Sequence, residues 1–295
     1  MTEPDSPDAG VDVPLTHDTV ETNGVSLHVV RAGPTDGDPV VLLHGFPEFW
    51  YGWRHQIPAL VDAGYRVVAP DQRGYNRSEK PDGLDAYTAD TLGTDAVGLL
   101  DAFGHDEARF VGHDWGAAVL WDVLLRSPDR VTQAVTMNVP HPAAFAEYMG
   151  TASQLRKSWY MFAYQLPRVP EAALRFDGWS GMRWFIDTSN RDDTFTESDL
   201  DRYREAWARP RAVTAMLDWY RALFRRDVPD PPSWTVTPPT MVVWGLQDPY
   251  LRREMAPASV DQCADGRLEE IEDATHWVHH ERSARVNDLL ADFFE

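Results

Sequence analysis

One short junction between a strand and a helix decides the fold of this chain: Phe110-Val111-Gly112-His113-Asp114-Trp115-Gly116-Ala117. An apolar run leads into the junction, and a helical pattern over 115–126 follows it. Gly112 and Gly116 flank the turn because strand and helix pass close together there and leave no room for larger side chains. The pattern is typical of a nucleophile elbow with Asp114 at its centre. The alternative is that Asp114 only caps the following helix, for which Asp is a favourable residue.

Short apolar runs alternate with helix-length segments along much of the chain. A parallel sheet covered on both faces requires such runs, because each of its strands is buried on both sides. We therefore predict a doubly wound, mostly parallel α/β fold. The predicted strands are 40–43, 66–69, 108–111, 131–137, 240–244 and 267–271, and 88–103 is one of the helical segments between them.

The chain divides into three predicted parts. Residues 1–18 are rich in Asp, Pro and Gly, so we expect a disordered acidic tail and order from about Thr19. Residues 19–139 and 237–295 carry the strand pattern and form the predicted core. Residues 140–236 are helical in pattern, rich in Trp, Tyr and Arg, and end in the proline-dense stretch 228–239, which indicates an inserted helical cap.

The composition fits a globular chain with a strongly acidic surface. Hydrophobic residues make up 43% of the sequence, and the formal net charge is -20. This charge disfavours nucleic acid and anionic membranes as partners. Lysine occurs only at Lys80 and Lys157. An acidic, lysine-poor surface resembles those of salt-adapted proteins, and an ordinary acidic enzyme is the alternative.

Several classes of partner and compartment are not expected. The only cysteine, Cys263, cannot form an internal disulfide, and no basic stretch followed by an apolar run opens the chain, so we expect a cytoplasmic protein. No apolar stretch reaches the roughly 18 residues of a membrane span. The histidines lack ligand spacing and no phosphate-binding glycine loop occurs, so no metal or cofactor is expected. A homo-oligomer is possible.

An elbow needs backbone donors for the oxyanion, and one normally comes from the loop after an earlier strand. That loop follows the run Val40-Val41-Leu42-Leu43-His44-Gly45-Phe46-Pro47. The predicted donors are the N–H groups of Phe46 and Trp115. We expect His44 to shape the loop and His113 to point away from Asp114, so neither is a catalytic candidate. A cis peptide before Pro47 is compatible with this loop.

An acid and a histidine should follow the elbow in that order, each just past the end of a strand. Asp248 follows the run 240–244, and His276 follows the run 267–271. Taken singly, Asp248 reads equally well as a turn residue before Pro249, and His276 as a surface histidine. Their joint occurrence in the expected order favours a triad of Asp114, Asp248 and His276. His279 and His280 are predicted to be solvated or packed.

The chain resembles the cap-bearing epoxide hydrolases of the α/β-hydrolase superfamily from about Thr19 to its end. The segments that carry the resemblance are His44-Gly45-Phe46-Pro47-Glu48-Phe49-Trp50 with Trp53-Arg54, Asp71-Gln72-Arg73-Gly74-Tyr75 with Ser78, Gly112-His113-Asp114-Trp115-Gly116, Asn138-Val139-Pro140-His141-Pro142, Ser158-Trp159-Tyr160 with Gln165-Leu166-Pro167, and Leu217-Asp218-Trp219-Tyr220-Arg221. In some relatives the acid follows an earlier strand, where this chain has Asn138, so Asp248 is the better candidate. The resemblance implies that Tyr160 and Tyr220 are ring-opening tyrosines, with Tyr164 a competitor for the first.

The implied reaction converts an epoxide to a vicinal diol through an alkyl ester on Asp114, with water activated by His276. A haloalkane dehalogenase, which uses the same ester, is the nearest alternative, but Phe46 stands where such enzymes often carry an asparagine donor. A fluoroacetate-type dehalogenase is disfavoured because Trp115 replaces its typical arginine. Asp114 excludes a serine esterase. A non-catalytic binding protein of this fold is disfavoured because all triad members are present.

Overall fold

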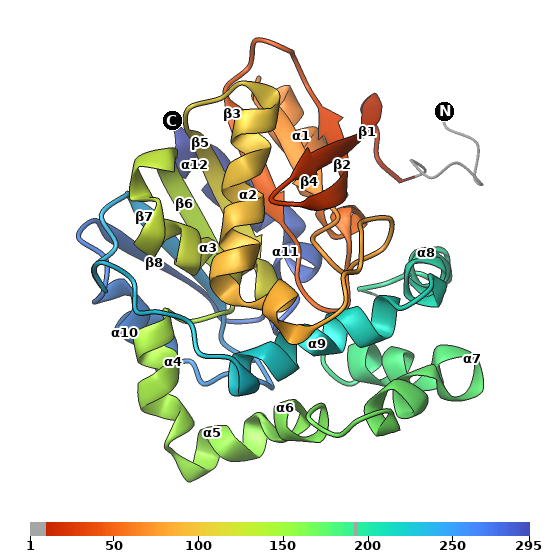
Figure 1. Cartoon of the computed structure of the whole chain (residues 1–295). Helices are drawn as coiled ribbons and strands as arrows, with labels where there is room; N and C mark the ends of the chain where they lie inside the picture. The colour runs from red at the N-terminus through yellow and green to blue at the C-terminus, as the bar shows by residue number, and fades with distance from the viewer. Residues whose placement is uncertain (1–9, 192–193) are drawn as a thin grey trace.

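The computed structural model describes residues 10–191 and 194–295, and within them the chain forms one eight-stranded sheet (Figure 1). The strand order is β1-β2-β4-β3-β5-β6-β7-β8. All pairs from β4 to β8 are parallel, which confirms the predicted doubly wound sheet. The strands are β1 (Leu15–Thr22), β2 (Val25–Ala32), β3 (Pro39–Leu43), β4 (Arg66–Pro70), β5 (Ala108–His113), β6 (Val131–Met137), β7 (Thr240–Gly245) and β8 (Gly266–Ile271).

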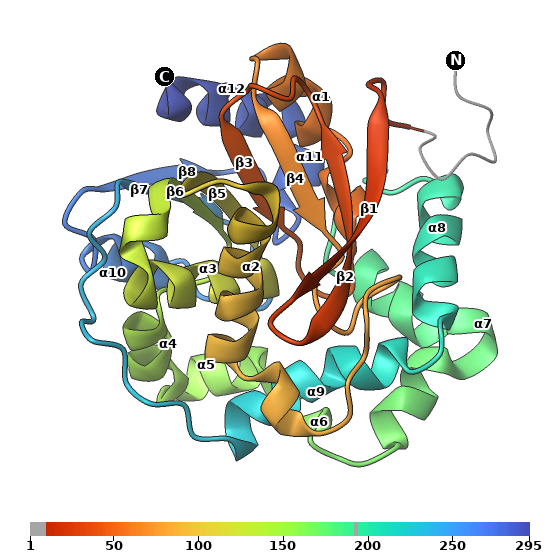
Figure 2. The same cartoon turned by 45° about the horizontal axis from the view of Figure 1, so that its top comes forward.

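Helices cover both faces of this sheet, as Figures 1 and 2 show. The helices α2 (Ala89–Phe103) and α3 (Trp115–Arg126) pack together on one face. The helices α1 (Gln56–Asp62), α11 (Val278–Glu281) and α12 (Ser283–Phe294) lie on the other face. Shorter elements complete the core: α10 (Met255–Val260) and the 3-10 turns η1 (Trp50–Trp53), η2 (Leu84–Tyr87) and η3 (Pro128–Arg130). The interior strand β7, next to the edge strand β8, is buried at every position, as a strand covered on both sides must be.

The antiparallel edge of the sheet corrects the sequence prediction. Ordered structure begins before Thr19, because β1 starts at Leu15 and pairs with β2 along its whole length. Residues 1–9 of the predicted tail lie outside the described part. Asn23 and Gly24, both with positive φ, join the two strands. An Asn-Gly pair is a strong hairpin signal, since a tight turn needs two residues that tolerate positive φ.

In the described part of residues 140–236, six helices stand between β6 and β7, and we keep the name cap for this range as our proposed division. They gather at one end of the sheet (Figure 1). They are α4 (Pro142–Met149), α5 (Ala152–Lys157), α6 (Trp159–Ala163), α7 (Val169–Asp187), α8 (Glu197–Ala208) and α9 (Ala212–Arg225). The helix α7 is interrupted by a non-helical kink over residues 176–179. No helix in the described ranges is long and apolar enough to cross a membrane.

Candidate active site

The elbow holds Asp114 in a strained backbone conformation between β5 and α3. Its φ is 49° and its ψ is -126°, a region that residues other than glycine rarely adopt. A Cβ on Gly116 would collide with the carbonyl group of Leu43, and one on Gly112 would lie 2.6 Å from the carbonyl oxygen of Gly116. The close approach predicted for the two glycines is therefore confirmed. It leaves the Asp114 side chain 16% exposed at the end of the sheet.

The structure brings Asp114, Asp248 and His276 into one hydrogen-bonded line. His276 Nε2 lies 3.3 Å from Asp114 Oδ2, and His276 Nδ1 lies 2.8 Å from Asp248 Oδ2. Asp248 follows β7 and His276 follows β8, neighbouring parallel strands whose carboxyl ends meet at the same edge of the sheet. The three side chains thus have the spacing of a nucleophile, a base and its orienting acid.

The charges of the triad determine its protonation. Burial alone would lower the pKa of His276, but the charge of Asp248 and hydrogen bonds to Asp114 and Asp248 raise it to about 10. Burial alone would raise the pKa of Asp248, but the charge and hydrogen bond of His276 and the amide of Asn138 bring it below its ordinary value. The resting site therefore holds a protonated imidazole between two carboxylates.

This protonation links His276 to stability at high pH. A pKa raised from 6.5 to about 10 adds stability that is complete below pH 6.5 and is lost as the pH approaches 10. We expect the free energy of unfolding of the wild-type protein to fall more between these two pH values than that of His276→Gln. Urea titrations measure the difference, with His105→Gln as the control. Equal losses in wild type and His276→Gln would contradict the assignment.

The loop after β3 supplies one of the two predicted oxyanion donors. The N–H of Phe46 donates to Asp114 Oδ1 at 2.7 Å. An added Cβ on Gly45 would lie 2.7 Å from the same oxygen, so only glycine lets the loop come this near. His44 accepts a hydrogen bond from the N–H of Gln72 and so fixes the loop, as predicted, and the Phe46–Pro47 bond is cis. The contribution of the Trp115 N–H stays a prediction.

Three cap tyrosines surround Asp114. Tyr160 lies on α6, Tyr164 directly follows that helix, and Tyr220 lies on α9. Their ring centroids are 5.1 Å apart for Tyr164 and Tyr220 and 6.0 Å apart for Tyr160 and Tyr220. Burial, followed by the charge of Asp114, raises the pKa of each hydroxyl above its ordinary value. All three therefore keep their protons at neutral pH, and both Tyr160 and Tyr164 remain candidates.

Three residues that hold the acid Asp248 were not assigned this role from the sequence. The amide of Asn138 donates to Asp248 Oδ2 at 2.7 Å. The N–H groups of Tyr250 and Leu251 donate to Asp248 Oδ1 at 2.7 and 2.9 Å. The ring of Tyr250 also packs 5.3 Å from that of His276. The turn after Asp248 thus orients its carboxylate. No local sequence pattern indicates this role.

A buried carboxylate, Glu48, forms a second polar centre behind the triad. Its Oε1 accepts from Tyr203 at 2.6 Å and pairs with His280 at 2.7 Å. Its Oε2 lies 3.4 Å from both His113 and His279. His279 and His280 are therefore packed rather than solvated. His113 contacts the carbonyl oxygen of His276 at 2.8 Å and, as predicted, turns away from the elbow.

This centre contains a possible metal-ligand set that the sequence analysis did not foresee. Ligand atoms of Glu48, His113 and His279 lie within 4.8 Å of one another, and these residue types bind zinc. Glu48, His113 and His279 lie far apart in the sequence, so their spacing did not indicate a metal site. Glu48 Oε1 is satisfied by Tyr203 and His280. Glu48 Oε2 and the facing nitrogens of His113 and His279, at 3.4 Å, form no hydrogen bond in the described ranges. We therefore describe the cluster as a buried polar network with a hydrogen-bonded Oε1 side and an unsatisfied Oε2 side.

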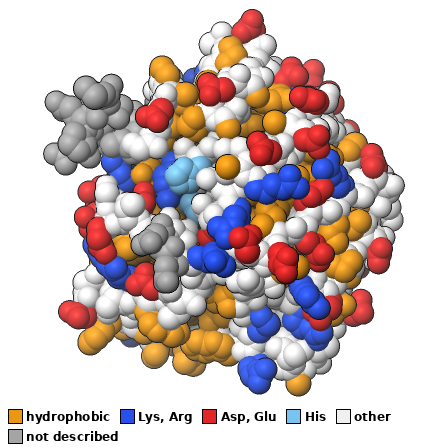
Figure 3. All heavy atoms as spheres, turned by 180° about the vertical axis from the view of Figure 1, so that it is seen from behind, with side chains coloured by type: hydrophobic (Ala, Val, Ile, Leu, Met, Phe, Trp, Pro, Cys, Tyr) orange, Lys and Arg blue, Asp and Glu red, His pale blue; other side chains and the backbone are white. Residues whose placement is uncertain are grey.

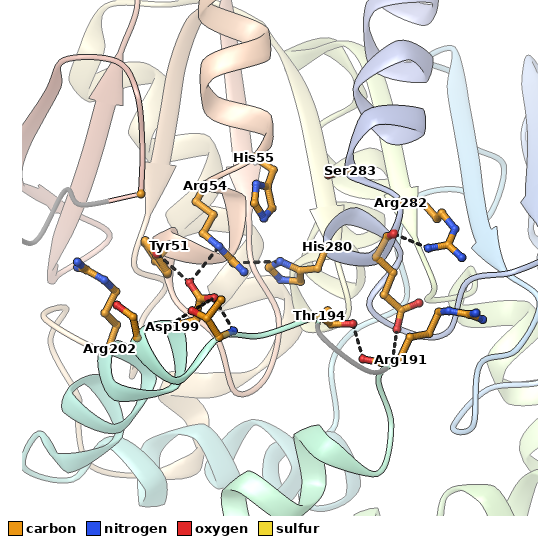
Figure 4. Close-up of a pocket in the computed structure, with 14 residues that line it drawn as sticks. Tyr51, Arg54, His55, Arg191, Thr194, Asp199, Arg202, His280, Arg282 and Ser283 are labelled. Carbon is orange, nitrogen blue, oxygen red and sulfur yellow. Dashed lines mark hydrogen bonds and ion pairs between the residues drawn. The ribbon is translucent and has the colours of Figure 1, made fainter. Parts of the chain in front are cut away.

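The pocket in Figure 4, of about 650 Å³, lies beyond this network and not at Asp114. Arg54 reaches from its wall to His280 Nδ1 at 3.1 Å and to Asp199 at 3.3 Å. His280 is shared between the pocket wall and Glu48. The pocket is polar and contains none of the triad residues, so we do not place the substrate there.

Comparison with known proteins places this geometry in a family. A family model described as the alpha/beta hydrolase fold matches residues 38–283. The AB hydrolase superfamily protein YfhM of Bacillus subtilis is 45% identical, over 94% of this chain and 96% of that protein. Epoxide hydrolase A of Mycobacterium tuberculosis is 34% identical, over 94% of this chain and 97% of that protein.

A solved structure agrees with these sequence relatives. The crystal structure of Bacillus megaterium epoxide hydrolase in complex with an inhibitor superposes with a TM-score of 0.87 at 31% identity. The match covers 94% of this chain and 99% of that chain. The chain therefore belongs to the α/β-hydrolase family. Within it, the chain belongs with the epoxide hydrolases.

Proposed function

We propose that the protein hydrolyses epoxides to vicinal diols through a covalent ester on Asp114. The observation that carries the proposal is a carboxylate at the elbow that lies 3.3 Å from His276 and near enough to three protonated tyrosines for its charge to raise their pKa. A carboxylate can displace oxygen from an sp³ carbon, and tyrosines can protonate the oxygen that leaves. The epoxide hydrolases among the relatives support the same reaction in general terms.

In the first step, an Asp114 oxygen attacks one carbon of the ring and the bond from that carbon to the ring oxygen breaks. The oxygen takes a proton from Tyr220 or from its partner, Tyr160 or Tyr164. An alkoxide is a far stronger base than a phenolate, whose conjugate acid has a pKa of about 10, so this transfer is downhill. The product is an alkyl ester on Asp114 with a free hydroxyl on the neighbouring carbon.

Formation of the ester changes the charge around His276. Asp114 is then neutral, so one of the groups that raised the pKa of His276 is lost and the pKa falls. His276 can give its proton to the tyrosinate and become a base. Asp248, held by Asn138, keeps the imidazole oriented for this second step.

In the second step, His276 takes a proton from water, and the resulting hydroxide attacks the carbonyl carbon of the ester. The carbonyl oxygen becomes negative and accepts from the N–H of Phe46 and, we propose, of Trp115. The bond to the diol oxygen breaks, and that oxygen takes the proton from His276. The carboxylic acid left on Asp114 then returns a proton to His276, which restores the charged pair.

Aromatic side chains around Asp114 favour an apolar substrate. The Tyr220 ring lies 5.5 Å from that of Phe46 and 5.0 Å from that of Trp115, and Phe185 packs 5.6 Å from Phe46. These rings offer surface to an aromatic or aliphatic group on the epoxide. We therefore propose an apolar epoxide and water as the substrates.

A haloalkane dehalogenase is the second candidate, because the same ester and base would serve it. It needs N–H donors for the departing halide, and Trp115 could supply one. Among the cap tryptophans in the described ranges, Trp207 and Trp219 donate their indole N–H groups to backbone carbonyls. Trp159, Trp184 and Trp234 are exposed on the outside of the cap, and Trp179 lies in the kink of α7, partly buried against Trp207. Their positions favour epoxide opening over halide release.

Styrene oxide and 1-bromobutane, supplied separately at low and molar salt, test the choice. We expect chromatography to detect the diol from styrene oxide and a colorimetric assay to detect no halide. Halide release without diol would move the assignment to a dehalogenase. Neither product, combined with saturable binding of the epoxide, would favour a non-catalytic binding protein.

Two further parts of the proposal concern the compartment of the enzyme and its adaptation to salt. The lone Cys263, which cannot form an internal disulfide, supports a cytoplasmic enzyme. The net charge of -20 with only two lysines supports adaptation to high salt, which the molar-salt arm of the assay examines.

A further inference from the structure

The large exposed hydrophobic side chains of the described ranges are confined to one region of the chain. All ten large hydrophobic residues that are exposed in the described ranges lie between 155 and 234: Leu155, Trp159, Phe162, Leu166, Val169, Phe176, Trp184, Leu223, Phe224 and Trp234. Figure 3 shows hydrophobic side chains gathered along its lower edge, where Figure 1 places α5, α6 and α7. Exposed apolar surface of this extent marks an interaction site.

The net charge lies outside the region that carries these exposed apolar side chains. Residues 140–236 contain 13 Arg and Lys and 13 Asp and Glu, so the cap has a formal charge of zero. The whole net charge of -20 therefore belongs to the rest of the chain. Two copies of this protein repel each other through their cores, and their caps are the surfaces that can approach with the least electrostatic cost.

The kink in α7 presents the most exposed of these apolar side chains. Phe176 is 70% exposed, and the three residues after it, Asp177, Gly178 and Trp179, all have positive φ. Such a run is costly and persists where surrounding structure or function requires it. Arg175 and Asp177 flank Phe176 and are exposed, and neither forms an ion pair with any residue of the described ranges.

A two-fold axis at this kink would make the triplet Arg175-Phe176-Asp177 complementary to itself. The two Phe176 rings would meet at the axis, and Arg175 of each copy would face Asp177 of the other. We propose that the protein forms a symmetric homodimer through the outer face of α5, α6 and α7, centred on Phe176. A C2 contact requires this kind of self-complementary patch.

The composition of this face favours a protein partner over a lipid surface. Exposed Trp, Phe and Arg with few Asp, Glu and Lys is the composition of protein interface centres. Two further arginines on the same face, Arg156 and Arg168, are exposed and have no ion-pair partner in the part of the chain described. An anionic bilayer would attract these arginines but repel the strongly acidic core beside them.

Charge reversal tests the pairing directly. Sedimentation velocity from low to high micromolar concentration, at fixed salt, should show a monomer–dimer equilibrium for the wild-type protein. Arg175→Asp and Asp177→Arg each place like charges across the axis, so each should raise the dimer dissociation constant at least about tenfold. The double variant exchanges the two charges and should restore dimerisation. Arg77→Asp, at an exposed arginine outside the cap, is the matched control and should leave it unchanged.

The remaining outcomes overturn the proposal. A wild-type protein that stays monomeric throughout, or a dimer that resists both single reversals, removes the interface. A double variant as monomeric as the singles removes the two-fold pairing. A monomer that sediments with phosphatidylglycerol vesicles and loses this binding in Phe176→Asp assigns the face to lipid instead. Unchanged far-ultraviolet circular dichroism verifies that each variant is folded.

Discussion

Asp114→Ala is expected to abolish diol formation, with a loss of at least about 10,000-fold in turnover, because no other side chain can form the ester. The loss should occur in a folded protein, since the Asp114 side chain is partly exposed and alanine removes only its carboxylate. Diol analysis by chromatography measures it. Residual turnover within about tenfold of wild type would exclude a covalent ester on Asp114.

The variant His276→Gln tests the second step of the same reaction, hydrolysis of the ester. The variant should form the ester but hydrolyse it slowly, because glutamine cannot take a proton from water. Intact-protein mass spectrometry should then show an adduct with the mass of one substrate. Asp114→Ala/His276→Gln is the matched control and should show none. An adduct that persists in the double variant would place the ester on another residue.

The second large effect concerns the cap tyrosines. Tyr160→Phe combined with Tyr220→Phe is expected to slow ester formation by about 100-fold to 10,000-fold, the usual contribution of a positioned acid. Each substitution removes a hydroxyl and keeps the ring, so Tyr220 still packs against Phe46 and Tyr160 against Tyr220. Stopped-flow measurement of the first turnover separates this step from hydrolysis of the ester. Tyr148→Phe, on α4, controls for loss of a cap hydroxyl away from the triad.

The same experiment decides between the two candidates for the first tyrosine. If Tyr164→Phe with Tyr220→Phe is the slower pair, Tyr164 is the ring-opening acid and Tyr160 is a packing residue. If the variant with all three substitutions forms the ester at the wild-type rate, the proposal of tyrosine acids is wrong. A dehalogenase would also be indifferent to these hydroxyl groups.

The parts of the fold that depend on short-range patterns could be predicted from the sequence. Most of the six parallel strands are short runs rich in apolar and β-branched residues, and each of the six appears in the structure within about two residues of its predicted bounds. The elbow could be predicted because Gly112 and Gly116 flank Asp114 at a fixed spacing, which lets the strand and the helix pass close together. Asp248 and His276 could be proposed because the chain order of strands fixes which loops share an edge of the sheet.

Interactions that join distant segments could be recognised only in the tertiary structure. Glu48 meets His113 and His280, which lie 65 and 232 positions further along, and no spacing rule connects them. The hairpin of β1 and β2 was missed for a different reason. Its edge strand is half exposed and mostly polar, so the apolar pattern is weak, although the Asn23-Gly24 turn was present in the sequence.

The cap shows most clearly what the sequence determines and what only the tertiary structure decides. The sequence predicts a helical cap rich in Trp, Tyr and Arg over residues 140–236, between the predicted strands 131–137 and 240–244. Only the packing decided that Tyr160 faces inward while its neighbour Trp159 is 58% exposed. Composition records how many apolar side chains a helix has. Which of them are covered depends on what the rest of the chain, or a second copy of it, places against them.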